Sequence, residues 1–97
     1  MDRQRISFSI AEHPYQLEIE PELEEAIRRA VDSVNERINH ARGRYPSVDI
    51  REILSMVLLE EEARLVRLEH RDAGTLSELG KEIETLDRQL GEYLYGR

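Results

Sequence analysis

Hydrophobic and polar residues alternate over much of the first twenty positions, a pattern typical of strands with one buried face. Two alternating runs are separated by residues 11–14, a length that suits a hairpin loop. The apolar positions of these runs are Ile6, Phe8, Ile10, Tyr15, Leu17 and Ile19. Residues 4–20 are therefore predicted to form a β-hairpin. Its apolar face needs a cover, because a lone hairpin is barely stable.

The next segment changes to a helical period and predicts that cover. Pro21 suits the first position of a helix, and glutamates follow in the first turn, where the helix dipole favours them. Apolar residues then recur every three or four positions and form one stripe: Leu23, Ala26, Ile27, Ala30, Val31, Val34, Ile38 and Ala41. The pattern predicts a helix over residues 21–42 that ends near Gly43.

A second helix is predicted to begin after Asp49, which suits an N-cap. Glu52 completes a capping box. No proline follows, so this helix is expected to run to about Tyr93, a length of roughly 65 Å. Its first part, residues 50–68, carries a broad apolar stripe suited to packing on the preceding elements: Ile50, Ile53, Leu54, Val57, Leu58, Leu65 and Leu68.

The end of the chain carries a heptad repeat, which we name the seam: Leu76, Leu79, Ile83, Leu86, Leu90 and Tyr93. Steps of three and four residues are the a/d repeat of a left-handed coiled coil. The preceding residues are too few to cover the far end of such a helix, so the seam predicts an intermolecular coiled coil. The expected fold is α+β, with a head over residues 1–68 and a stalk over 69–97. Gly74 and a change of register predict a soft joint at 69–75.

Charges beside the seam favour an antiparallel assembly. With Leu76 at position a, Glu82 and Asp87 would face each other across the chains of a parallel dimer and repel. Leu94 widens the apolar face, which favours four or more helices. A plain two-stranded parallel coil with unoptimised flanks is the alternative.

The composition narrows the classes of partner. The chain has 14 basic and 21 acidic side chains and a net charge of −7, which argues against nucleic acid. It has no cysteine, which excludes disulfides and thiolate metal sites and fits a cytosolic protein. No apolar run approaches the roughly 18–20 residues that span a bilayer, and the start does not resemble a signal peptide, so no membrane association is expected.

No pattern of residues indicates catalysis. His13, His40 and His70 lie on separate predicted elements without the spacing of metal ligands. The run Glu60–Glu62 is consecutive, so its carboxylates point about 100° apart on a helix and predict a salt-bridged surface with nearby arginines. The sequence contains no phosphate-binding loop and no nucleophile motif. We therefore expect neither an enzyme nor a cofactor.

One segment is basic within this acidic chain. Residues 37–48 contain no acid, and their cationic or titratable side chains, which we name the basic patch, are Arg37, His40, Arg42 and Arg44. Arginine forks suit carboxylates, which makes the patch a candidate docking site for an acidic partner. A helix C-terminus also attracts cations to its dipole, which would account for one or two of these residues. Both interpretations remain open on the sequence.

The order of hairpin, helix, turn and long helix, together with particular residues, resembles the ZapA family of bacterial cell-division proteins. The resemblance covers residues 5–70, and the stalk agrees in character only. The motifs that carry it are the strand Ile6–Ile10, Pro14-Tyr15-x-Leu17-x-Ile19, Glu24-Glu25-x-Ile27-Arg28-x-Ala30, Val34-Asn35-x-Arg37-Ile38 and Asp49-Ile50-x-Glu52-Ile53-Leu54-x-Met56-Val57.

The resemblance implies a non-enzymatic cytoplasmic protein that binds polymers of FtsZ, a tubulin-like GTPase, and cross-links them at the division ring at midcell. Family members dimerise through head and helix, and longer ones pair dimers into antiparallel tetramers. Charged head residues contact FtsZ, which implies such roles for Arg37, Arg42, Arg44 and His13, the last in the predicted hairpin loop. Asn35 is a family hallmark and is expected to satisfy backbone groups or a neighbouring chain.

Two other functions are compatible with the pattern. A prefoldin-like chaperone subunit also combines a hairpin with coiled-coil helices, although its hairpin links the two helices instead of preceding them. A general oligomerisation adaptor with an unknown partner needs only the coiled coil. FtsZ binding separates the first interpretation from both of these.

Overall fold

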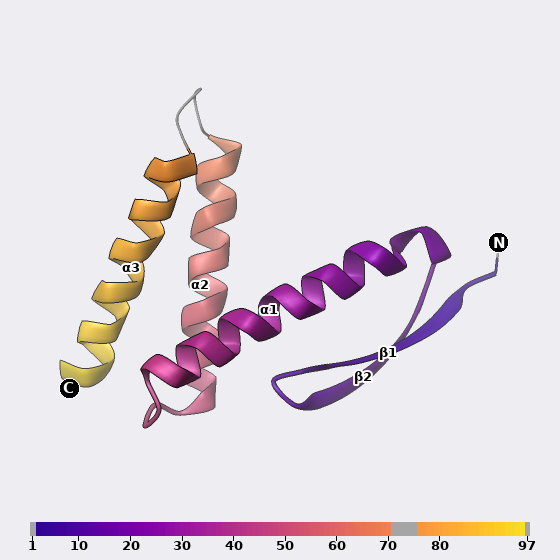
Figure 1. The fold of residues 1–97 in the computed structure, drawn as a ribbon, viewed down its shortest axis with the longest axis horizontal. Helices are drawn as coiled ribbons and strands as arrows, with labels where there is room; N and C mark the ends of the chain where they lie inside the picture. The colour runs from indigo at the N-terminus through magenta and orange to yellow at the C-terminus, as the bar shows by residue number, and fades with distance from the viewer. Residues whose placement is uncertain (1, 71–75, 97) are drawn as a thin grey trace. The chain divides into compact units, whose positions relative to one another are not determined.

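The structure is a computed structural model that describes residues 2–70 and 76–96. Strands β1 (Gln4–Ile10) and β2 (His13–Ile19) are followed by a short 3-10 helix (Pro21–Leu23) and by helices α1 (Glu24–Arg44), α2 (Ile50–Glu69) and α3 (Leu76–Gly96) (Figure 1). An antiparallel hairpin followed by helices confirms the predicted α+β class. The chain divides within α1 into two compact units, Met1–His40 and Ala41–Arg97. The head–stalk boundary at residue 69 stays a prediction.

The hairpin has a tighter turn than the sequence predicted. β1 and β2 pair antiparallel along their whole length, with Ile10 opposite His13. Only Ala11 and Glu12 lie between the strands, so the predicted four-residue loop over 11–14 is wrong. Both turn residues have positive φ angles, 50° and 70°, the conformation that a two-residue hairpin turn requires. His13 consequently begins β2, and its ring centroid lies 4.8 Å from that of Tyr15.

Asn35 of α1 holds this turn. Its side-chain Nδ2 donates to the carbonyl oxygen of Ser9 at 2.7 Å, and its Oδ1 accepts from the amide of Ala11 at 3.1 Å. One amide side chain therefore satisfies a backbone acceptor and a backbone donor beside the turn. These bonds favour a backbone conformation that alanine and glutamate rarely adopt on their own. The expectation that Asn35 satisfies backbone groups is confirmed.

The first unit covers its apolar face incompletely. Ile6 and Ile19 of the hairpin are buried, whereas Tyr15 and Leu17 on the same face of the sheet each remain 43% exposed. Leu23, at the start of the predicted helical stripe, is also exposed. A two-stranded sheet and one helix offer too little surface to enclose every apolar side chain. Part of the hairpin face is therefore open to solvent.

The second unit begins with the last turn of α1 and the corner into α2. Tyr45 follows α1 directly and is buried, and its carbonyl oxygen accepts from the amide of Val48 at 3.1 Å. Asp49 is the N-cap of α2, as predicted, because its carboxylate accepts from the amide of Arg51 at 2.8 Å. Ile53 lies one turn further on and is fully buried. These local contacts fix where α2 starts.

A single chain does not form the one long helix expected from Ile50 to about Tyr93. Helix α2 ends at Glu69, where His70 leaves the helical conformation with φ −108° and ψ 9°. Helix α3 packs against α2 and runs antiparallel to it (Figure 1). Most of the expected joint, residues 71–75, lies outside the described residues. Ile83 of the seam is buried by these two helices within one chain, whereas the heptad repeat predicted that another chain would cover it.

Tyr45 packs against α3 at a point where α3 has no side chain. A Cβ atom added to Gly91 would lie 2.9 Å from the ring atoms Cε1 and Cζ of Tyr45, closer than real Cβ contacts allow. Gly80, on the same helix, faces open space. Glycine at position 91 therefore lets the tyrosine ring approach the backbone of α3. Among the described residues of this unit, the other buried apolar side chains are Ala41, Ile53, Met56, Val57 and Ile83.

Replacing Asn35 tests the support of the hairpin turn. Asn35→Ala is expected to lower the free energy of unfolding by about 1–2 kcal/mol, because it removes two hydrogen bonds to the backbone. Ser33→Ala, at an exposed position of the same helix, is the control. Urea unfolding gives the stability, and hydrogen exchange of the Ala11 amide reports the turn directly. Unchanged exchange at Ala11 in the Asn35 variant would contradict this role.

Gly80 and Gly91 of α3 give a matched test of its packing. Gly80→Ala is expected to raise stability by about 1 kcal/mol, since alanine favours helix and nothing lies nearby. Gly91→Ala is expected to lower it by about 1–3 kcal/mol, because the Tyr45 ring must move aside. Thermal and urea unfolding measure both changes. An equal rise in the two variants would show that α3 does not rest on Tyr45.

Candidate functional site

All four residues of the basic patch lie on α1, but they belong to different units. Arg37 and His40 are in the first unit, and Arg42 and Arg44 are in the second. His40 is exposed, and Arg37 and Arg42 are half-buried. Arg42 and Arg44 are two positions apart on the helix, so their side chains point to nearly opposite sides, about 160° apart. A partner that meets one of these two arginines therefore approaches from a different side than a partner that meets the other.

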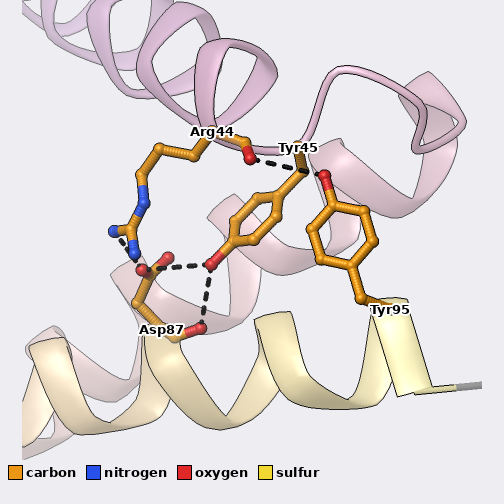
Figure 2. A network of polar contacts seen from close by, with 4 residues as sticks. All are labelled: Arg44, Tyr45, Asp87 and Tyr95. Carbon is orange, nitrogen blue, oxygen red and sulfur yellow. Dashed lines mark hydrogen bonds and ion pairs between the residues drawn. The ribbon is translucent and has the colours of Figure 1, made fainter.

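Arg44 is already engaged by an acid of its own chain. Its Nη1 forms an ion pair with Oδ2 of Asp87 on α3 (Figure 2). Its guanidinium carbon lies 5.5 Å from the centroid of the Tyr45 ring, within the range of a cation–π contact. The Arg44 side chain is 49% exposed, whereas that of Asp87 is only 15% exposed. One side of the guanidinium therefore faces Asp87 while about half of the side chain faces water.

Two tyrosines complete this network. The Tyr45 hydroxyl lies 3.4 Å from Oδ2 of Asp87 and 3.4 Å from its main-chain oxygen, so it donates to one of them at a time (Figure 2). The Tyr95 hydroxyl donates to the carbonyl oxygen of Arg44 at 3.3 Å. The ring centroids of Tyr45 and Tyr95 lie 5.3 Å apart. Burial raises the pKa of the Tyr45 hydroxyl above its usual value, and the negative charge of Asp87 adds to that rise. The hydroxyl therefore remains a donor at neutral pH.

A second ion pair joins α2 and α3, between Arg67 and Glu82. Glu82 and Asp87, which the sequence analysis expected to repel across a parallel dimer, thus each face an arginine of their own chain. Both arginines are about half exposed, so water screens the two ion pairs, and Arg67–Glu82, which is half exposed on both sides, contributes about 1 kcal/mol or less. They favour the antiparallel packing of the two helices but do not enforce it.

Glu61 of the acidic run of α2 forms an ion pair of the kind that the sequence predicted. Glu61 Oε1 lies 3.7 Å from Arg64 Nε, one helical turn away. Among the described residues, no group of histidine and acidic side chains could hold a metal ion. Over the same residues, no helix has the length and hydropathy that a membrane span requires.

One side of α2 carries exposed leucines. Leu58 is 70% exposed and Leu65 is 51% exposed, next to the side of the helix on which Ile53 and Val57 are buried. We name the exposed set the leucine face: Leu54, Leu58, Leu65 and Leu68. The single broad stripe predicted for residues 50–68 is therefore divided into a buried and an exposed half. An exposed apolar face of this kind marks a candidate protein interface.

The seam is partly covered within one chain. Ile83 is buried, Leu86 and Leu90 are half-buried, and Tyr93 is 66% exposed. The side chains of Leu76 and Leu79 lie outside what the structure describes. Association of chains through the seam stays a prediction, and so does the role of the basic patch and His13 in binding a partner.

No sequence pattern predicted the Arg44–Asp87 network. Arg44 and Asp87 are 43 positions apart, and no local spacing rule links residues at that separation. Asp87 was expected to flank a coiled coil, and no role was predicted for the side chain of Tyr45. Only the return of α3 along α2 brings them together.

Comparison with known families agrees with the architecture. A family model described as cell division protein ZapA matches residues 6–90, from within β1 to within α3. Comparisons with curated proteins and with solved structures give no match. The family match spans the hairpin, α1, α2 and most of α3, well over half of the chain. The chain therefore belongs to the ZapA family of cell-division proteins.

Proposed function

We propose that this protein binds FtsZ polymers and cross-links their protofilaments into bundles, and so stabilises the division ring at midcell. It acts in the cytoplasm as a binding protein without catalysis. The observation that carries this proposal is the ZapA family match over residues 6–90. The proposal also fits the resemblance drawn from the sequence motifs between residues 5 and 70.

Cross-linking needs at least two filament-binding surfaces in one particle, so the chain must associate with itself. The leucine face of α2 supports that requirement, because it places four leucines at the surface of a single chain. Full burial of an exposed leucine is favourable by about 1.5–3 kcal/mol, and these leucines, which are 37–70% exposed, gain roughly in proportion to that exposed fraction. We propose a homodimer through this face and an antiparallel tetramer built from two dimers. Two linked heads then convert weak filament contacts into avid bridging.

The filament contact is proposed for the basic patch. Arg42 and Arg44 lie in the last turn of α1, and arginine suits the carboxylates of an acidic filament surface. His13 and Arg37 are further candidates from the resemblance. Because Arg42 and Arg44 point to different sides of α1, their contributions should be separable by single substitutions.

The leucine face is tested by changing its most exposed member. Leu58→Gln is expected to weaken dimerisation at least tenfold, because each interface loses buried apolar surface from both copies. Leu58→Met keeps a similar apolar volume and is the control at the same position. Sedimentation equilibrium of both variants measures the change. Equal association of the glutamine and methionine variants would move the interface away from this face.

Filament binding is tested by co-pelleting with GTP-assembled FtsZ at moderate salt. The wild type is expected to pellet with FtsZ. The double variant Arg42→Glu/Arg44→Glu is expected to bind at least about tenfold more weakly, because reversed charges repel an acidic surface. Arg29→Glu reverses the charge of another exposed arginine of α1 and is the control. Each patch arginine is also reversed alone.

The outcomes separate the candidate functions. Loss in the patch variant but not in Arg29→Glu supports both FtsZ binding and the patch. If all variants pellet equally, FtsZ binding holds and the patch is not the contact. If the wild type does not pellet, the cross-linker proposal fails, and suppression of aggregation of an unrelated protein then separates a chaperone from an adaptor.

A further inference from the structure

Two donors converge on one carboxylate oxygen at the corner between α1 and α2. The Arg44 guanidinium forms an ion pair with Oδ2 of Asp87, and the Tyr45 hydroxyl lies 3.4 Å from the same oxygen (Figure 2). Arg44 and Tyr45 are adjacent in sequence, and the Tyr45 ring is buried against α3 at Gly91. A cation and a hydroxyl fixed in this way form a binding site for a carboxylate.

We propose that Arg44 and Tyr45 form a carboxylate-binding site that Asp87 fills within the chain, and that an acidic segment of a partner competes with Asp87 for it. The proposal rests on the proposed function, in which such a segment belongs to the filament. It adds an autoinhibitory contact to that function, because α3 then lowers the affinity of Arg44 for the partner.

Exposure and charge show why Asp87 can be displaced. The Arg44 side chain is 49% exposed, so an incoming carboxylate can reach the guanidinium while Asp87 is still bound. Because about half of the Arg44 side chain is exposed, water screens this ion pair and solvates the guanidinium when it is released. The Tyr45 hydroxyl also lies 3.4 Å from the main-chain oxygen of Asp87, so it keeps a hydrogen-bond acceptor in the interval between the departure of the Asp87 carboxylate and the arrival of another. The site therefore exchanges ligands without unfolding α3.

The competition with Asp87 determines how far the affinity of the site for an acidic ligand is lowered. A ligand that binds only the open form of a site has its apparent affinity reduced by the fraction of open sites. A weak internal ion pair leaves a moderate fraction of the Arg44 sites occupied by Asp87. Removing the Asp87 charge should therefore tighten the binding of acidic ligands about twofold to fivefold. Neutralising any acid of this chain also lowers its general repulsion of an acidic ligand. The gain in affinity on removing the Asp87 charge must therefore be compared with the gain on removing a neighbouring charge.

The experiment uses the full chain and two ligands. Asp87→Asn removes the charge and keeps the shape, and Glu84→Gln removes one charge from an exposed position of the same helix. The first ligand is a hexaglutamate peptide, titrated at low salt and followed by NMR. The second ligand is GTP-assembled FtsZ in the co-pelleting assay. Both single variants are repeated with Arg44→Gln in the same chain.

The expected result is a twofold to fivefold tighter binding of hexaglutamate by Asp87→Asn than by Glu84→Gln, lost when Arg44→Gln is present. Equal binding by Asp87→Asn and Glu84→Gln overturns the proposal. A gain that survives Arg44→Gln also overturns it, because the gain then comes from loosening of α3 or from net charge. The peptide result stands without FtsZ, so failure to bind FtsZ removes the proposed function and not the carboxylate site.

Discussion

The arrangement of the Ala41–Arg97 unit depends on the contact between the Tyr45 ring and the bare backbone of Gly91. Tyr45 is buried immediately after α1, so its position determines where the last turn of α1 meets α3. Any side chain at position 91 would have to displace the ring. Because Arg44 precedes Tyr45, the same contact brings its guanidinium to Asp87. A packing constraint of apolar origin thus positions the polar groups of the candidate site.

Because α3 returns along α2, part of the seam and its flanking charges make contacts within one chain instead of between chains. A heptad repeat needs an apolar helix to pack on, and its side chains do not specify whether that helix belongs to the same chain. Here α2 supplies part of it, Ile83 is buried, and Glu82 and Asp87 face arginines of their own chain. The apolar surface that remains most exposed is on α2, around Leu58. The surface that we propose for association of chains is therefore on α2, and association through the seam of α3 stays a prediction.

Local patterns predicted the local structure. Alternation identified the hairpin, the i+3/i+4 spacing identified α1, and the N-cap Asp49 identified the start of α2. The two-residue turn was missed because Ala11 and Glu12 lack the usual glycine or asparagine, and Asn35, 24 positions from Ala11, supports it instead. The end of α2 and the Arg44–Asp87 pair depend on long-range packing, for which sequence spacing carries no signal. The proposed function came from a family resemblance and not from any chemical motif.

A distance between α2 and α3 tests the central claim most directly. The chain has no cysteine, so Arg51→Cys and Glu92→Cys introduce two unique sites for spin labels at exposed positions near the N-terminus of α2 and the C-terminus of α3. Pulsed electron resonance on labelled chains diluted with unlabelled protein gives the distance within one chain. Antiparallel packing predicts a distance below about 25 Å, labels included, because packed helix axes lie 8–10 Å apart. A distance of roughly 60 Å, the span of 41 residues in one continuous helix, would contradict the return of α3 and with it the Arg44–Asp87 site.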